Sequence, residues 1–355
     1  MAQGRKDELF RLCPGIDFAF GTGEISRLPE LIERARKGER PAHFPAPTSL
    51  EKLPVRRHSS FQAYVTVAEG CSNACAYCVV PFVRGPLRSR PLPEVLEELW
   101  GLAEAGYKEV TLLGQNVDAY GRDLRDGTDF ARLLREVAKV PIPRVRFTSS
   151  HPAYMTDETI AAIAEGGNIC PHVHLAVQSG SDRILRAMGR GYTRERFLKI
   201  VERLREAVPG VNITTDIIVG FPGETEEDFA ATLSLIEEVK FGTVYVAAYS
   251  PRPYTRAARL PDSIPREEKS RRLAEVLSLT RRIAHELHRA RIGGREEVLV
   301  EGYLPEKRLY HGKTKDFRTV LFPGEEALVG TFVEVLVEAA SPGAMEGCVV
   351  KERVA

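Results

Sequence analysis

The sequence has few cysteines and no long apolar run. Its 355 residues contain six cysteines, too few and too scattered for the disulfide framework of a small secreted domain. No run of about 18 apolar residues occurs, so no membrane-spanning helix and no membrane partner are expected. The N-terminal stretch MAQGRKDELF lacks the apolar core of a signal peptide. We therefore predict a cytoplasmic protein.

The chain also lacks an excess of charge of either sign. Its 50 Lys and Arg residues nearly balance 49 Asp and Glu residues, which gives a formal net charge of +1. A nucleic-acid partner is therefore not indicated by global charge and would need a local basic patch. With 43% hydrophobic and 28% charged residues, the composition is that of a globular protein with one large domain and one or two small ones.

The first part of the chain predicts a small α/β fragment. An apolar run at 16–20 favours a strand, and the pattern over 28–36 favours a helix. Residues 38–58 carry four prolines and little periodicity, which is typical of a linker.

From residue 61 onward, apolar runs alternate with amphipathic helical patterns. The runs are mostly apolar rather than cleanly alternating, which suits a parallel sheet covered by helices. Six such units in series predict an α/β fold with a parallel sheet or an incomplete (β/α)6 barrel, in which chemistry gathers at the C-terminal ends of the strands. The expected strands are 64–67, 109–113, 144–149, 172–177, 212–219 and 243–249, and the clearest helices are 93–104, 193–207, 226–239 and 266–291.

The pattern changes after Gly293 and Gly294. Short strand patterns such as EEVLVEGY, FRTVLFPG and TFVEVLVEAA are separated by glycine and proline turns. About 60 residues of this kind predict a small β-barrel of OB-like type. We therefore expect three parts: an N-terminal unit with its linker at 1–56, a core at 57–291 and a barrel at 292–355.

Three of the six cysteines are concentrated in the segment EGCSNACAYCVVPFVRG. Cys71, Cys75 and Cys78 have the spacing C-x3-C-x2-C and follow the first core strand. Close thiolates bind zinc or iron–sulfur clusters, and a structural zinc site needs four closed ligands. Three cysteines can hold three irons of a four-iron cubane and leave the fourth iron open to a small molecule. A [4Fe-4S] cluster is the favoured interpretation, with a zinc site completed by a distant residue, or simply clustered buried thiols, as alternatives.

With the aromatic Tyr77 before the third cysteine, this loop resembles that of the radical S-adenosylmethionine (SAM) superfamily. The segments EVTLLGQNVDAYG, RFTSSHP, TTDIIVGFPGETEEDF and AAYSPRPYTRAA resemble its methylthiotransferases, and NICPHVHL resembles the tRNA-modifying branch. The resemblance implies an incomplete radical SAM barrel, an N-terminal α/β remnant and a C-terminal TRAM domain, which is an RNA-binding β-barrel. The chain departs from the family at Ala176, Tyr254 and Arg256, where Pro, Gly and Pro are usual.

The resemblance implies a transferase that adds a methylthio group to C2 of N6-isopentenyladenosine in tRNA, next to the anticodon. Methylthiolation of a ribosomal-protein aspartate or of threonylcarbamoyladenosine in tRNA remains an alternative, as does a non-catalytic RNA-binding iron–sulfur protein. The implied cofactors are a [4Fe-4S] cluster and S-adenosyl-L-methionine. The implied partners are tRNA, an electron donor such as flavodoxin or ferredoxin, and a sulfur source, with the chain itself a monomer.

Polar residues and glycines at the strand ends are the candidates for cofactor binding. By the resemblance, the methionine moiety of the cofactor lies beside the end of the second core strand. A carboxylate inside an apolar strand, such as Asp216, is costly to bury unless it is paired, and a glycine at a strand end lets the backbone approach a ligand. The expected cofactor-binding residues are Tyr77, Gly114, Gln115, Asn116, Ser150, Gln178, Asp216 and Gly220.

The barrel contains one local basic segment with aromatic residues interleaved. Basic groups for phosphates and rings for base stacking together predict an RNA surface, with an ordinary solvated loop as the alternative. The expected RNA-binding residues are Lys307, Arg308, Lys313, Lys315 and Arg318.

Family members carry a second [4Fe-4S] cluster in an N-terminal domain, and its three ligand cysteines are absent from this chain. In family members the corresponding sequence is a glycine, a ligand cysteine and then Met-Ala-Gln, so Met1 aligns just after the last of those ligands. Cys13 does not occupy the position of any of these ligands, so we do not predict it to bind a cluster. We therefore expect an N-terminally truncated chain that holds one cluster and lacks the full activity of the family.

Overall fold

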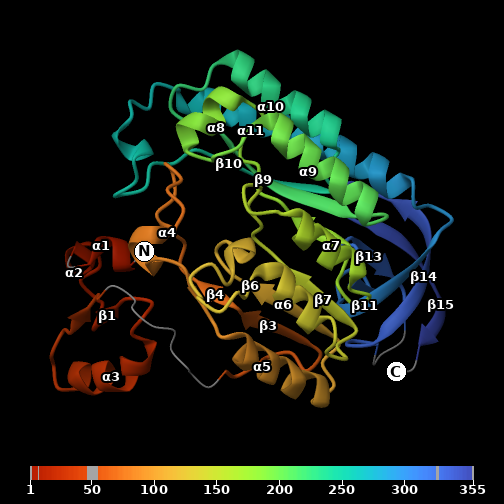
Figure 1. The fold of residues 1–355 in the computed structure, drawn as a ribbon, viewed down its shortest axis with the longest axis horizontal. Coiled ribbons are helices and arrows are strands. Elements are labelled where there is room, and N and C mark those ends of the chain that lie inside the picture. Colours follow the sequence, from red (N-terminus) through yellow and green to blue (C-terminus); the bar gives the residue numbers. More distant parts are fainter. Residues whose placement is uncertain (1, 7, 46–54, 325–327, 354–355) are drawn as a thin grey trace.

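The computed structural model describes residues 2–6, 8–45, 55–324 and 328–353. The chain forms three parts that follow one another in the sequence. Figure 1 shows a small N-terminal unit in red on one side, a β-barrel in blue on the opposite side, and the α/β core between them.

The N-terminal unit is a two-stranded parallel sheet with helices around it. The predicted helix over Leu28–Arg36 is confirmed as α3. The predicted strand at 16–20 is shorter in the structure, because only its last two residues pair with another strand. The elements are α1 (Ala2–Arg5), α2 (Glu8–Leu12), β1 (Ala19–Phe20), the 3-10 turn η1 (Ile25–Arg27), α3 and β2 (Ala42–His43). Residues 46–54 of the predicted linker lie outside the described residues.

The core contains the predicted incomplete barrel of parallel strands. One three-stranded sheet has the order β3-β6-β7 and the other has the order β10-β9-β8. Isolated bridges from Val145 to Ile169 and from Ser150 to Leu175 join the two sheets, so β3 and β10 are the end strands of one curved surface. The strands are β3 (Gln62–Thr66), β6 (Glu109–Leu113), β7 (Arg144–Phe147), β8 (His172–His174), β9 (Asn212–Val219) and β10 (Thr243–Ala248).

Four core strands end earlier than predicted, and two of them, β3 and β10, end earlier by one residue only. The strand expected at 144–149 ends at Phe147, and the one expected at 172–177 ends at His174. Just beyond them, Ser149 has φ 67° and Gln178 has φ 76°. The left-handed conformation is incompatible with a regular strand, so each chain turns away at the C-terminal end of the sheet.

The helices cover the outer face of the curved sheet. One hydrophobic core lies between the helices and the sheet. Val65 and Leu112 on the strands pack in the same core as Val95 and Leu99 on α5, and all four are fully buried. The helices are α5 (Leu92–Glu104), α6 (Phe130–Val137), α7 (Asp157–Glu165), α8 (Asp182–Met188), α9 (Arg194–Ala207), α10 (Glu226–Val239) and α11 (Arg266–Arg289). No helix in the described part of the chain has the length and apolarity needed to cross a membrane.

Short polar residues fix where the core helices begin. The side chains of Asp129, Thr156, Ser181 and Thr193 each accept a hydrogen bond from a backbone N–H three residues later. Thr225 forms a complete capping box at the start of α10. Caps of this kind each stabilise a helix by about 1 kcal/mol.

The C-terminal part is the predicted small β-barrel. Its five strands close in the order β11-β12-β13-β15-β14. Inside, Val298, Val300, Val320, Phe322 and Val335 are fully buried. The strands are β11 (Arg295–Leu304), β12 (Leu309–Thr314), β13 (Thr319–Phe322), β14 (Phe332–Ala340) and β15 (Met345–Arg353).

Two buried arginines of the core hold the barrel in place. Arg144 and Arg146 project from the same side of β7, and their side chains are 1% and 3% exposed. Each guanidinium donates two hydrogen bonds of 2.8 to 2.9 Å to backbone oxygens of the barrel, which belong to Glu297, Lys313, Thr314 and Lys315. Because four main-chain acceptors lose water at this junction and all find a donor, the two parts are docked in one fixed geometry.

The turn between β12 and β13 closes one end of the curved sheet. The Phe317 ring stacks on His172 at a centroid distance of 4.6 Å, and the Arg146 guanidinium lies 5.0 Å from the same ring. His172 is the first residue of β8, and Arg144 and Asn212, the first residues of β7 and β9, also donate hydrogen bonds to the barrel. The barrel therefore forms a floor beneath the inner surface of the core, at the end opposite to the strand C-termini.

Candidate functional site

The three clustered cysteines lie together in one loop above the end of β3. This loop joins β4 (Ala68–Glu69) to α4 (Val80–Arg84), and all three thiols are partly buried. Burial raises the pKa of the Cys71 and Cys78 thiols, and the nearby Cys75 raises both further. The Cys78 N–H donates to the Cys75 oxygen at 3.1 Å, so the three predicted ligands lie within one compact turn of the chain.

The chemistry of the three thiols fits an iron–sulfur cluster. Among the described residues, no group of three or more His, Cys, Asp or Glu side chains is arranged to hold a metal ion. A structural zinc site needs four closed ligands, whereas three thiolates can each bind one iron of a four-iron cubane. The donor set therefore fits a [4Fe-4S] cluster with one iron not bound by cysteine.

The backbone of the loop is held by contacts that only a glycine permits. Gly70 has φ 74°, and a Cβ atom there would lie 2.0 Å from the Pro86 oxygen. The Gly70 N–H donates to Oε1 of Gln115 at 2.5 Å, and the Cys71 N–H donates to the Gly85 oxygen at 3.1 Å. Gln115, predicted to bind the cofactor, thus braces the cysteine loop from the end of β6.

A buried arginine lies directly against the loop. Nη1 of Arg190 is 3.4 Å from Sγ of Cys75 and 3.3 Å from the hydroxyl of Tyr77, while Nη2 donates to the Ala176 oxygen at 2.6 Å. Burial alone would lower the pKa of Arg190, but Tyr77, Tyr192 and Cys75 outweigh it and raise that pKa. The result is a permanent positive charge beside one sulfur. The sequence analysis missed Arg190, whose only signal is its place between two glycines.

Asn116 is the clearest sign of a missing ligand. Its side chain is 3% exposed, and neither its Nδ2 nor its Oδ1 has a hydrogen-bond partner among the described residues. It lines a cavity of about 240 Å³ together with Cys71, Asn73 and Tyr154. A buried amide left without partners costs about 1–3 kcal/mol, so a polar ligand beside Cys71 would satisfy it. This observation agrees with the predicted cofactor site.

Ser150 takes part in an internal network rather than facing an open space. Its hydroxyl donates to Oδ1 of Asp118 at 2.8 Å, and the backbone N–H of His151 donates to Oδ2 at 3.1 Å. Burial of the carboxyl raises the pKa of Asp118 to about 7, although both hydrogen bonds oppose the shift. Asp118 was not singled out from the sequence, since it reads there as an ordinary turn residue after a strand.

The remaining predicted cofactor residues lie around the C-terminal ends of the strands. Asp216 is partly exposed and lies 3.2 Å from Nε2 of His174, so the pairing expected for a carboxylate in this strand is present. Gln178 has its backbone bonded to β9. Gly220 has φ 70°, and a Cβ there would lie 2.5 Å from Cγ of Lys269. Close packing against α11 therefore explains the glycine at position 220. At Gly114, a Cβ would lie 3.2 Å from Cα of Val117, so space is limited there too.

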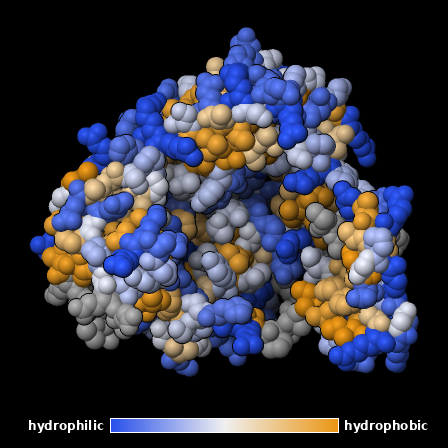
Figure 2. Space-filling model, turned by 180° about the vertical axis from the view of Figure 1, so that it is seen from behind, coloured by the Kyte–Doolittle hydropathy of each residue, from blue (hydrophilic) through white to orange (hydrophobic). Residues whose placement is uncertain are grey.

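The inner surface of the curved sheet encloses an open cavity, here called the lumen. It has a volume of about 460 Å³, and Figure 2 shows a deep hollow at the middle of the molecule. Tyr64, Thr111 and Thr148 line it along the strands, and His172 and Phe317 line it at the floor. The lumen thus extends from the barrel toward the strand ends that carry the predicted site.

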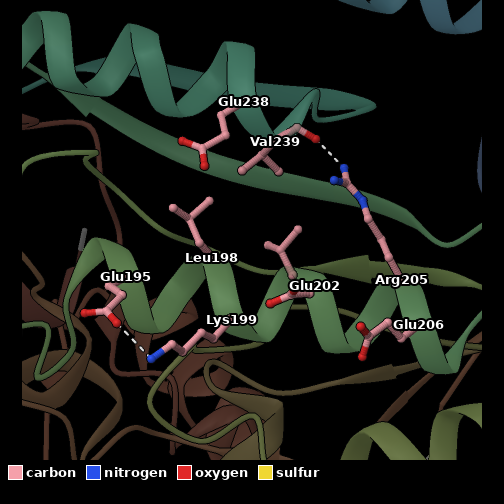
Figure 3. A pocket seen from close by; sticks show the side chains of 9 residues that line it. Glu195, Leu198, Lys199, Glu202, Arg205, Glu206, Glu238 and Val239 are labelled. Atoms are coloured by element: carbon pink, nitrogen blue, oxygen red, sulfur yellow. Dashed lines mark hydrogen bonds and ion pairs between the residues drawn. The ribbon is translucent and has the colours of Figure 1, made fainter.

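A second cavity, of about 530 Å³, lies on the outside of the molecule. Figure 3 shows it between α9 and α10, with Leu198 and Val239 flanked by charged side chains. Glu195 pairs with Lys199 at 2.8 Å, and Arg205 donates to the Val239 oxygen. This groove contains none of the residues predicted for the site, and its pairs are those of a solvated helical surface.

The structure does not bring the five predicted RNA-binding residues together. Lys307 and Arg308 are exposed in the turn between β11 and β12. The other three contact the protein itself. Nζ of Lys313 donates to Thr319, Lys315 donates to the Gly167 oxygen, and Arg318 pairs with Asp316. Only the first two are therefore presented freely to a partner.

The curved parallel sheet and the three-cysteine loop above it define a radical SAM protein. Residues 65–236 match the family model of the radical SAM superfamily. The fold is also that of TsrM from Kitasatospora setae, a radical S-adenosylmethionine methyltransferase, with a TM-score of 0.53 and 19% identity over 67% of this chain and 52% of that chain.

Closer relatives identify the family within this class. A tRNA-2-methylthio-N(6)-dimethylallyladenosine synthase from Dictyoglomus thermophilum is 43% identical over 99% of this chain and 81% of its own length. One from Carboxydothermus hydrogenoformans is 44% identical over 96% of this chain and 79% of its own length. The chain belongs to the family of tRNA-2-methylthio-N(6)-dimethylallyladenosine synthases.

Proposed function

We propose that this chain is a radical SAM methylthiotransferase that adds a methylthio group to C2 of N6-isopentenyladenosine in tRNA, next to the anticodon. Family membership supports the substrate, and the cysteine loop at the mouth of the lumen supports the chemistry. The observation that carries the proposal is the buried, unpartnered Asn116 beside Cys71 at the end of β6.

Cys71, Cys75 and Cys78 would hold a [4Fe-4S] cluster, and Arg190 would donate a hydrogen bond to the sulfur of Cys75. When bound, the cluster and S-adenosyl-L-methionine supply the one-electron chemistry needed at a C–H bond that acid–base groups cannot activate. The chain's own residues bind and orient the cofactor and the substrate. Those proposed to surround the cofactor are Tyr77, Gly114, Gln115, Asn116, Ser150, Gln178, Asp216 and Gly220.

Each of the three parts of the chain would have a different role. The core at 57–291 performs the reaction, and the barrel at 292–355 binds tRNA through Lys307 and Arg308. The N-terminal unit packs against α4, beside the cysteine loop, through α1 and Thr22. An electron donor such as flavodoxin or ferredoxin and a sulfur source complete the reaction. We place the protein in the cytoplasm as a monomer.

The test is mass spectrometry of tRNA nucleosides from a deletion strain of the source organism. Complementation with the wild-type gene should restore the 2-methylthio group on isopentenyladenosine. Cys75→Ala should fail to restore it, while Cys13→Ala, which changes an exposed cysteine outside the loop, should restore it fully. If the deletion instead removes a methylthio group only from threonylcarbamoyladenosine or from a ribosomal protein, the proposed substrate is wrong.

A further inference from the structure

Two tyrosines stand on the end strands of the curved sheet with their rings exposed. Tyr64 on β3 is 69% exposed and Tyr245 on β10 is 51% exposed. Both sit in the middle of their strands, next to the buried side chains of Ala63 and Val65 on β3 and of Val244 on β10. Large aromatic rings left open to solvent on a strand indicate a surface that something else covers.

Both rings lie on the lumen side of the sheet. The neighbours of Tyr64, Ala63 and Val65, are buried in the helix-covered core, so alternation along β3 directs Tyr64 to the opposite face. Tyr64 accordingly lines the lumen, next to Thr111 in strand register. The same alternation places Val244 in the core and Tyr245 on the lumen face.

Tyr245 belongs to a small cluster of polar side chains on that face. Its ring centroid lies 5.6 Å from that of His174, and it is in register with Asp216 on β9. Asp216 in turn contacts His174 at 3.2 Å. Tyr245 is therefore fixed beside hydrogen-bonding groups, whereas the rest of its ring remains open.

The two end strands border the opening of the incomplete barrel. Within the described residues β3 pairs only with β6, and β10 pairs only with β9, so no further strand continues the sheet beyond either of them. The floor formed by Phe317 and His172 blocks the other end of the lumen. A planar group that enters past either end strand therefore meets an exposed tyrosine ring.

We propose that Tyr64 and Tyr245 form the stacking surface that receives the target adenine base of the RNA inside the lumen. This inference rests on the proposed function. An enzyme that reacts at a base must take that base out of its stack, and aromatic side chains replace the lost stacking. Tyr64 lines the lumen, and Tyr245 lines an adjoining cavity of about 200 Å³, with Lys313 and Phe317 shared between the two. A flat base held where these cavities meet would contact aromatic faces while its edge reacts.

The experiment measures binding to an RNA hairpin by the anaerobically reconstituted protein. One hairpin carries N6-isopentenyladenosine at the target position of an anticodon stem-loop, and the other has an abasic site there. Fluorescence anisotropy gives both dissociation constants. The wild type should bind the first hairpin about tenfold more tightly than the second, because stacking on an aromatic ring contributes on that order.

The variants separate stacking from a structural role. Tyr64→Ala and Tyr245→Ala should each bring the ratio of the two constants close to one by weakening only the first hairpin. Tyr64→Phe and Tyr245→Phe should keep the ratio, because the ring remains. Trp100→Ala is the matched control, since Trp100 is an exposed aromatic on α5 outside the lumen, and it too should keep the ratio.

Two results would overturn the inference. Either the wild type binds both hairpins equally, or the alanine variants preserve the preference. Nucleoside mass spectrometry of the deletion strain keeps the two proposals apart. If the deletion removes the 2-methylthio group from isopentenyladenosine but the purified protein shows no binding preference, the stacking surface alone is wrong. If the tyrosines carry the preference but the deletion leaves that group in place, the proposed function is wrong and the base-binding surface stands.

Discussion

Nη1 of Arg190 lies 3.4 Å from Sγ of Cys75, and the arginine is 5% exposed. The contact joins the turn after α8 to the cysteine loop, across a separation of 115 residues. A charged donor against a ligand sulfur stabilises the more negative, reduced form of an iron–sulfur cluster.

We expect Arg190→Gln to make the cluster harder to reduce. Loss of the charge and of one charge-assisted hydrogen bond of about 1.4 kcal/mol lowers the midpoint potential by roughly 60 mV for one electron. Redox titration followed by electron paramagnetic resonance measures this shift. Arg186→Gln, an exposed arginine on α8, should leave the potential unchanged. An unaltered potential in cluster-loaded Arg190→Gln would contradict the assignment.

The buried carboxyl of Asp118 should make stability depend on pH. Burial raises its pKa from 3.8 to about 7, so between these values the folded protein keeps a proton that the unfolded chain has released. The free energy of unfolding therefore falls as the pH rises from about 4 to about 7, by up to about 4 kcal/mol. Urea denaturation at pH 5 and pH 7.5 measures the difference.

Asp118→Asn should flatten that pH profile, because the amide does not titrate. Asp17→Asn, which changes an exposed carboxylate in the N-terminal unit, is the matched control and should leave the slope as in the wild type. A slope that survives in Asp118→Asn would show that other groups cause it.

Gly70→Ala should damage the cysteine loop. The left-handed conformation costs an alanine about 1–2 kcal/mol, and the added Cβ would overlap the Pro86 oxygen at 2.0 Å. We expect less iron per chain after reconstitution and a lower melting temperature. Gly101→Ala, in α5 with nothing within 4 Å of its Cβ, should instead add up to about 1 kcal/mol of stability. Equal iron content in both variants would be inconsistent with this view of the loop.

Arg144→Met should loosen the barrel from the core. The Glu297 and Lys313 oxygens would lose their donor while still buried, at a cost of about 3 kcal/mol. Limited proteolysis should then cut between α11 and β11, near Gly293, faster than in the wild type. Arg295→Met removes only an exposed ion pair with Glu334 and should change the cleavage rate little. The same rate for both variants would argue against a docking role.

Local pattern predicted the elements better than the contacts between them. The strands Glu109–Leu113 and Asn212–Val219 were predicted with their observed bounds, because each is rich in β-branched and leucine residues and is bounded by turns. The strand expected at 144–149 was too long, because the positive φ of Ser149 carries no signal in a serine.

The site was predictable where spacing alone defines it. Three cysteines within eight positions identify their own loop, whereas Arg190 and Asp118 become notable only when separate strand ends converge. Likewise, the density of basic residues in the barrel was visible, but the sequence does not say which side meets the core. The side chains of Lys313 and Arg318 contact other barrel residues, and that of Lys315 contacts the core at Gly167, which the sequence does not indicate.

The way the barrel is docked leaves its sequence unusually free to diverge. Arg144 and Arg146 contact main-chain oxygens, which every residue type supplies. Substitutions in the barrel that keep its backbone path preserve these four bonds whatever side chain they introduce. The barrel surface that contacts RNA can therefore change in evolution while the barrel stays docked in the same way. The two arginines cannot be replaced without losing these bonds.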